Sequence, residues 1–311
     1  MTSVIEVSNL TKYYGEQTAV DHISFKVKAG EVFGFLGPNG AGKTTTIRML
    51  TGIIEPDEGT AQIMGYDIRR QTVKAKELMG ILPETSNAYV DLSAWNNLML
   101  MGEIYGVPKK EREEKAKELL QRLGLYERKD DHVKGFSQGM KKRLMICMAL
   151  IHSPPLLFLD EPTSALDVQS TRLIRDMLRE LNENDTSIFL TTHNMEEANL
   201  LCDRVAIINH GKIAAIDSPE KLKSRIGGLN SVEVSFTSSP KLERLAEITN
   251  VREVKKFGDK FRLYTSNPSE VIAQIMEYTQ KNDSQIVTLQ TLAPTLEDIF
   301  VKLTEEKGRS K

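Results

Sequence analysis

The sequence predicts an α/β protein with a small antiparallel β layer and an inserted helical region, followed by a smaller α+β domain. A glycine-rich turn at residues 37–44 separates an apolar β-type run from a helical pattern. Continuously apolar runs at residues 156–159 and 188–190 lead into polar side chains, which is typical of parallel strands buried on both faces. After residue 230, strand and helix patterns follow the order β-α-β-β-α-β.

The composition is that of an ordinary globular protein. The 311 residues allow two domains, and a hydrophobic content of 40% is enough for buried cores. With 41 basic and 43 acidic side chains the net charge is −2, so we expect no nucleic-acid partner. Cys147 and Cys202 lie in apolar surroundings and are expected to be buried free thiols. We find no signal peptide and no run of about 18 uncharged apolar residues, so if this protein works at a membrane, we expect another chain to cross it.

The glycine-rich turn has the pattern of a phosphate-binding loop and predicts a P-loop NTPase core. It follows the β-type run at residues 32–36 and precedes a helix at residues 45–50. Glycines let successive N–H groups turn toward phosphate oxygens, and the helix presents its positive end to the same anion. Lys43 is expected to reach the β- and γ-phosphates, and the Thr44 hydroxyl to bind Mg²⁺. The residues expected to hold the nucleotide here are Gly37, Pro38, Asn39, Gly40, Ala41, Gly42, Lys43, Thr44 and Thr45.

Two kinds of local structure surround this loop. Helical patterns dominate residues 83–155, including 96–105 and 109–123, and predict the inserted helical subdomain. Short β-rich runs fill the first third of the chain and predict the antiparallel layer beside the loop. These runs are residues 4–7, 23–27, 31–36 and 60–64.

Polar side chains end the buried strands that follow. Asp160 is expected to hold Mg²⁺, directly or through water, and Glu161 to be the general base for an attacking water. The minor alternative is that these carboxylates only cap the next helix. His193 could donate a hydrogen bond to the γ-phosphate, although a lone histidine at a strand end is usually just a satisfied polar residue. Because strands alternate with helices here, we expect these groups to gather at the carboxyl ends of parallel strands.

A domain boundary is expected near residues 226–230, which divides the chain into residues 1–226 and 227–311. The order of the elements beyond it predicts a ferredoxin-like split βαβ module. The expected strands are residues 232–236, 251–257, 260–265 and 285–292, and the expected helices are residues 241–247, 269–281 and 295–305.

A second candidate anion site lies at residues 137–139, directly before a long helix. Ser137 is a good N-cap and Gly139 permits close backbone approach, although Ser137 could be merely a cap. Together with the motifs on either side, the order resembles the nucleotide-binding subunit of ATP-binding-cassette (ABC) transporters. The resemblance covers about residues 3–225.

The resemblance implies a role for each motif. Residues 37–45 match the Walker A loop, 156–161 match Walker B with its catalytic glutamate, and 164–167 match the D-loop. His193 matches the switch histidine. The signature matches Ser137, Gln138 and Gly139, which would contact ATP. Tyr14 falls where the family stacks an aromatic ring on adenine, although from the sequence alone it could equally be core packing.

Two positions depart from the commonest family pattern. Gln138 replaces a glycine of the signature, and Glu84 replaces a glutamine. The resemblance implies that Glu84 lies beside the metal together with Thr44 and Asp160, where a carboxylate adds charge and, unlike the amide, cannot donate a hydrogen bond. Both variants, and the tail at residues 294–300, resemble drug-resistance and related efflux cassettes.

The family implies a head-to-tail dimer in which the signature of one chain covers the ATP held by the Walker loop of the other. The partners would then be a second copy of the chain and an integral membrane permease, and the chain would work at the cytoplasmic face of the cell membrane. The reaction would be Mg²⁺-dependent ATP hydrolysis that powers transport, with export favoured. Residues 87–95 are a candidate groove for the permease, but Trp95, Leu98 and Met101 could instead be plain core of the helical insert.

Two other functions compete with transport. A soluble ABC-type ATPase would act as a mechanical switch without a transporter, but such proteins usually carry two cassettes or long coiled coils, and this sequence has one phosphate loop and no heptad run. A GTPase or small-molecule kinase is disfavoured, because no Asn-Lys-x-Asp base-reading motif is present and the signature would go unused.

Overall fold

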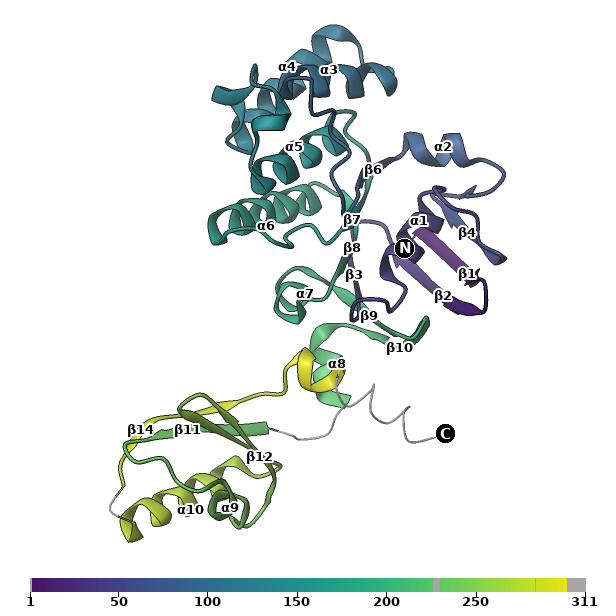
Figure 1. Ribbon diagram of the computed structural model, residues 1–311. Helices are drawn as coiled ribbons and strands as arrows, with labels where there is room; N and C mark the ends of the chain where they lie inside the picture. Colours follow the sequence, from purple (N-terminus) through teal and green to yellow (C-terminus); the bar gives the residue numbers. More distant parts are fainter. Residues whose placement is uncertain (1, 226–229, 283, 301–311) are drawn as a thin grey trace. The chain divides into compact units, whose positions relative to one another are not determined.

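The computed structural model describes residues 2–225, 230–282 and 284–300, which fall into two compact units, Met1–Ser218 and Pro219–Lys311 (Figure 1). The expected boundary between residues 226 and 227 lies outside the described residues. So does the end of the expected helix at residues 295–305, of which residues 296–300 are described and helical.

A six-stranded sheet forms the centre of the first unit, with the strand order β10-β9-β3-β8-β7-β6. All pairs are parallel except that between β9 and β10. Every residue of β3, β7 and β8 is buried, as expected for apolar strands covered on both faces. The strands are β3 (Val32–Leu36), β6 (Met79–Leu82), β7 (Leu156–Asp160), β8 (Ser187–Thr192), β9 (Arg204–Asn209) and β10 (Lys212–Asp217).

A second sheet, antiparallel with the order β2-β1-β4-β5, packs against the central one. Phe25 of this layer stacks on Phe33 of β3, with ring centroids 5.5 Å apart, and Phe158 and Phe189 extend the same aromatic core. The expectation that residues 31–36 belong to this layer was wrong. Residues 32–36 instead form β3, which pairs with β8 and β9 in the central sheet. This strand is apolar throughout because both of its faces are covered there. The strands of the layer are β1 (Ser3–Tyr14), β2 (Gln17–Lys28), β4 (Glu58–Ile63) and β5 (Tyr66–Asp67).

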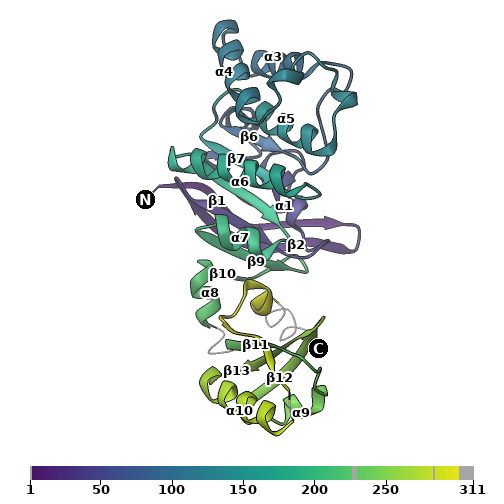
Figure 2. The ribbon, with the colours of Figure 1, turned by 90° about the vertical axis from the view of Figure 1, so that its left-hand side faces the viewer.

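Helices connect the strands of the central sheet, and the expected helical insert lies between β6 and β7. In both ribbon views α3, α4 and α5 gather beside β6 (Figures 1 and 2). Cys147 of α5 and Cys202 are buried free thiols, and burial raises the pKa of both. The helical segments of this unit are α1 (Lys43–Leu50), α2 (Thr72–Glu77), α3 (Ala94–Ile104), α4 (Lys109–Arg122), η1 (Tyr126–Arg128), η2 (Val133–Gly135), α5 (Gln138–Leu150), α6 (Val168–Glu183) and α7 (Met195–Leu201).

The second unit contains the expected ferredoxin-like module. Its four strands are all antiparallel in the order β12-β13-β11-β14, and one face packs on α10 around Val232, Val234 and Ile275. On β11, Glu233 alternates with these valines and accepts hydrogen bonds from Lys260 and Arg262, which hold its pKa at about 2. The elements are α8 (Pro219–Arg225), β11 (Asn230–Phe236), α9 (Leu242–Ala246), β12 (Val251–Phe257), β13 (Lys260–Thr265), α10 (Pro268–Lys281) and β14 (Ile286–Leu292).

Candidate nucleotide-binding site

The glycine-rich loop joins the end of β3 to the start of α1, as the sequence predicts. At Gly37 a Cβ atom would lie 2.4 Å from the main-chain oxygen of Ile208, so no larger residue fits. Gly42 has φ +108°, a left-handed conformation that side chains rarely adopt, and it caps α1. The loop therefore needs glycine at both positions to bring its backbone close to β9 and to turn into the helix.

Lys43 begins α1 and is only 6% exposed. Its Nζ donates hydrogen bonds to the main-chain oxygens of Gly37, at 2.7 Å, and Pro38, at 3.2 Å. The same Nζ lies 3.5 Å from Oε1 of Glu161. The loop thus folds around its own lysine, and the ammonium group is held between the loop carbonyls and the carboxylate that ends β7.

The carboxyl ends of β7 and β8 are linked by hydrogen bonds. Thr191 of β8 donates its hydroxyl to Oδ1 of Asp160, and the main-chain N–H of Glu161 donates to the Thr191 Oγ1 at 3.2 Å. Glu161 has φ +52°, a left-handed conformation that is uncommon for a glutamate and often marks functional sites. Its Oε2 lies 2.8 Å from Nδ1 of His193, whose side chain is 55% exposed. The strand ends thus fix Glu161 between Lys43 and His193.

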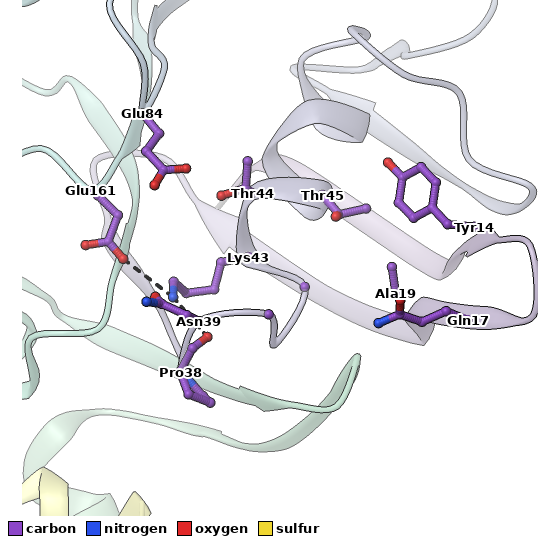
Figure 3. Close-up of a pocket in the computed structure, with 12 residues that line it drawn as sticks. Tyr14, Gln17, Ala19, Pro38, Asn39, Lys43, Thr44, Thr45, Glu84 and Glu161 are labelled. Carbon is purple, nitrogen blue, oxygen red and sulfur yellow. Dashed lines mark hydrogen bonds and ion pairs between the residues drawn. The ribbon is translucent and has the colours of Figure 1, made fainter.

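A pocket of about 330 Å³ opens over the loop and brings residues together from separate strands (Figure 3). Figure 3 shows the Lys43 ammonium group and the Glu84, Thr44 and Glu161 side chains around one end, and Tyr14 at the other. Of the residues predicted to hold nucleotide or metal or to be catalytic, the pocket is lined by Tyr14, Pro38, Asn39, Gly40, Gly42, Lys43, Thr44, Thr45, Glu84 and Glu161.

The other predicted residues lie outside the pocket wall. Asp160 is only 2% exposed and is the last residue of β7, while Gly37 and the buried Ala41 belong to the loop. His193 reaches the site through its contact with Glu161.

The signature residues also lie outside the pocket, at the start of α5. Ser137 caps this helix, since its Oγ accepts a hydrogen bond from the Met140 N–H at 3.3 Å. Ser137 and Gln138 are exposed, whereas Gly139 packs near Ser170 and Asp167 of the same chain.

Three residues of the site escaped the sequence analysis. Gln17 and Ala19 of β2 line the pocket beside Tyr14, and Thr191 orients the ends of β7 and β8. No local sequence pattern marks Gln17 or Ala19 as a pocket residue. The position of Thr191, two residues before His193 at the end of a buried strand, was a usable signal.

The donor set fits Mg²⁺ better than a softer metal. Thr44 offers a hydroxyl and Glu84 a carboxylate to the pocket, and the buried Asp160 directly precedes the pocket residue Glu161 in the chain. Within the part of the chain that the structure describes, no group of three or more His, Cys, Asp or Glu side chains could hold a metal by itself. Mg²⁺ commonly uses one or two protein oxygens and completes its shell with phosphates and water, so this sparse set of hard ligands suits it.

Comparisons with known proteins decide the family. The family model described as "ABC transporter" matches residues 20–164, and the model for the C-terminal domain of ATP-binding protein DrrA1-3-like matches residues 218–304. The chain is 37% identical to the linearmycin resistance ATP-binding protein LnrL of Bacillus subtilis over 97% of its own length and 98% of that protein. It belongs to the ABC transporter family of ATP-binding proteins. This ABC ATPase is also 37% identical to Nod factor export ATP-binding protein I of Ralstonia nicotianae, over 99% of its own length and 96% of that protein.

The solved structures agree with this assignment. An ATP-binding subunit of an ABC transporter superposes with a TM-score of 0.68 at 30% identity, covering 72% of this chain and 93% of that one. The ABC ATPase therefore binds ATP and hydrolyses it to ADP and phosphate to power transport, and it falls in the efflux group of the family. Among the described residues, no helix combines the length and apolarity that crossing a bilayer requires.

Proposed function

We propose that this ABC ATPase powers export through a separate membrane permease, as one of two identical subunits that enclose ATP between them. The observation that carries the proposal is the division of the site. The Walker loop and the carboxyl ends of β6 and β7 line one open pocket, while the serine-capped start of α5 lies exposed elsewhere on the same chain. A second copy in head-to-tail orientation would place its Ser137, Gln138 and Gly139 against the phosphates, where the helix N-terminus stabilises negative charge.

Each side chain then has a stated task in hydrolysis. Lys43 would leave the Gly37 and Pro38 oxygens for the β- and γ-phosphates, which releases Glu161 from its ion pair. Glu161 would accept the proton of the attacking water, and His193, held to its other oxygen, would orient it and donate to the γ-phosphate. Thr44, Asp160 and Glu84 would hold Mg²⁺, which when bound neutralises phosphate charge. Tyr14, about half exposed at the far end of the pocket, would stack on adenine.

Residues 87–95 are the proposed docking segment for the permease. Tyr89 and Val90 are 53% and 43% exposed, whereas Leu98 is fully buried and belongs to the core of the insert. The Asn97 side chain bonds both the N–H and the carbonyl of Tyr89, at 2.8 and 3.0 Å. The segment therefore presents apolar side chains on a fixed backbone directly after Glu84, so that movement of the permease would reach the metal site. The ATPase would then work at the cytoplasmic face of the cell membrane.

Capture of the tagged full-length chain from its native cells, in mild detergent, tests the link to transport. We expect a polytopic membrane protein to copurify with it, and a paired Tyr89→Asp and Val90→Asp change to remove that protein while ATP binding persists. Capture of the ATPase without any membrane protein would contradict the export proposal and favour a soluble switch.

Replacing Ser137 with arginine tests the shared site. The bulky cation at the start of α5 should block closure of two copies, so we expect ATP hydrolysis to fall about 100-fold, while one chain still binds ATP because Ser137 lies outside its pocket. Lys134→Ala, at another exposed position just before this helix, is the control and should behave as the wild type. Unaltered hydrolysis and dimerisation of the Ser137→Arg protein would refute the shared site.

A further inference from the structure

Lys142 is a buried cation with no part in the roles described above. It lies on α5, roughly 7 Å along the helix axis from the Ser137 cap at about 1.5 Å per residue. Only 8% of the residue is exposed. Its Nζ donates a hydrogen bond to the main-chain oxygen of Asp160, 3.3 Å away, at the end of β7. Burying an ammonium group is costly unless neighbours compensate for the lost hydration, so this position requires a reason.

The compensation comes from carboxylates at or just after the ends of β6 and β7 and from Glu197 of α7. Burial lowers the pKa of Lys142, while Asp160, Glu161, Glu84 and Glu197 act in the opposite direction and favour its charged form. Glu84 adds a negative charge where a glutamine would add none. The Lys142 ammonium group thus offsets part of the negative charge of these carboxylates from within the protein.

Other contacts of α5 show which elements the hydrogen bond from Lys142 to Asp160 connects. Arg143, next to Lys142, donates to the Leu123 oxygen at 2.9 Å and anchors the helix to the end of α4. Near the helix start, a Cβ atom at Gly139 would lie 3.3 Å from Oγ of Ser170, in α6. The hydrogen bond of Lys142 to Asp160 is a polar link from this helix to β7, whose end carries the carboxylates proposed for hydrolysis.

We propose that Lys142 is a positioning residue of the ATPase reaction, which ties the end of β7 to the helix that begins at Ser137. Asp160 and Glu161 act on the ATP held by their own chain, whereas Ser137 serves the ATP of the partner, so Lys142 connects the two ATP sites through one chain. This inference rests on the shared site proposed above. It assigns Lys142 no contact with substrate, because the residue does not line the nucleotide pocket.

The test compares Lys142→Met with Lys142→Arg in the full-length protein. Methionine fills similar space without charge or donor, so we expect kcat to fall about 10- to 100-fold while the affinity for ATP stays within about threefold. Arginine retains charge and donors and should recover most of kcat. Lys141→Met removes the same charge from the neighbouring, half-buried position and should leave kcat unchanged.

A second measurement does not depend on turnover. In a Glu161→Gln background, we expect Lys142→Met to reduce the fraction of protein that forms the ATP-dependent dimer, measured by light scattering. The melting temperature of the doubly substituted protein should equal or exceed that of the Glu161→Gln protein. Wild-type kcat in Lys142→Met, an equal loss in Lys141→Met, or a matching loss of ATP affinity would each overturn the inference. If Glu161→Gln protein with Lys142 intact fails to dimerise, the shared site is wrong and the proposed connection between two ATP sites is overturned with it, whatever kcat Lys142→Met shows.

Discussion

Replacing Glu161 with glutamine is expected to reduce ATP hydrolysis by about 10²- to 10⁴-fold and to leave ATP binding intact. Glutamine matches glutamate in shape, and its single amide oxygen can keep the contact with His193, while the ion pair of Glu161 with Lys43 is lost. It cannot accept the proton of the attacking water, however. Phosphate release under saturating ATP, together with equilibrium binding of a fluorescent ATP analogue, measures both quantities.

The control for this change is Glu196→Gln, which removes the same charge from an exposed position at the start of α7. It should hydrolyse ATP at the wild-type rate. If Glu161→Gln also did so, Glu161 would not be the base. A large loss of ATP affinity in the same variant would mean that Glu161 acts in binding rather than in hydrolysis.

Lys43→Ala is expected to weaken ATP binding about 100-fold, because charge-assisted bonds to phosphate are lost and no other ammonium group lines the pocket among the described residues. The change also leaves the Glu161 carboxylate without its ion-pair partner at 3.5 Å. Hydrolysis should fall with binding. Titration with the same fluorescent nucleotide gives the affinity directly.

Arg48→Ala provides the comparison, since Arg48 is exposed on the same helix and carries the same charge. We expect its affinity for ATP to equal that of the wild type within about twofold. Wild-type affinity in Lys43→Ala would show that the ammonium group, although buried in the loop, is not a phosphate ligand.

The sequence was most informative where the chemistry is local. The glycine-rich loop, its lysine and the helix behind it are contiguous, so their spacing alone predicts the anion site and the glycines at 37 and 42. The buried strands ending at Asp160 and near His193 could be recognised because parallel strands lack alternation. Assigning residues 31–36 to the antiparallel layer failed for a related reason: a run of six residues does not reveal which sheet it will join.

Contacts between segments that are distant in the sequence were harder to predict. Gln17 and Ala19 reach the pocket only because β1 and β2 form a hairpin that returns beside Tyr14. The hydrogen bond from Lys142 to Asp160 joins a helix to a strand in the central sheet, and a lysine in a basic run on α5 gave no sign of burial. Both features depend on tertiary packing, which periodicity does not encode.

The most direct test of the shared ATP site is the mass of the Glu161→Gln protein in solution. With ATP and Mg²⁺, light scattering should show twice the mass of a single chain, and without ATP the mass of one chain. Adding Ser137→Arg should return the loaded protein to the single-chain mass. A nucleotide-loaded Glu161→Gln protein that stays at the single-chain mass, even with its permease present, would contradict the account.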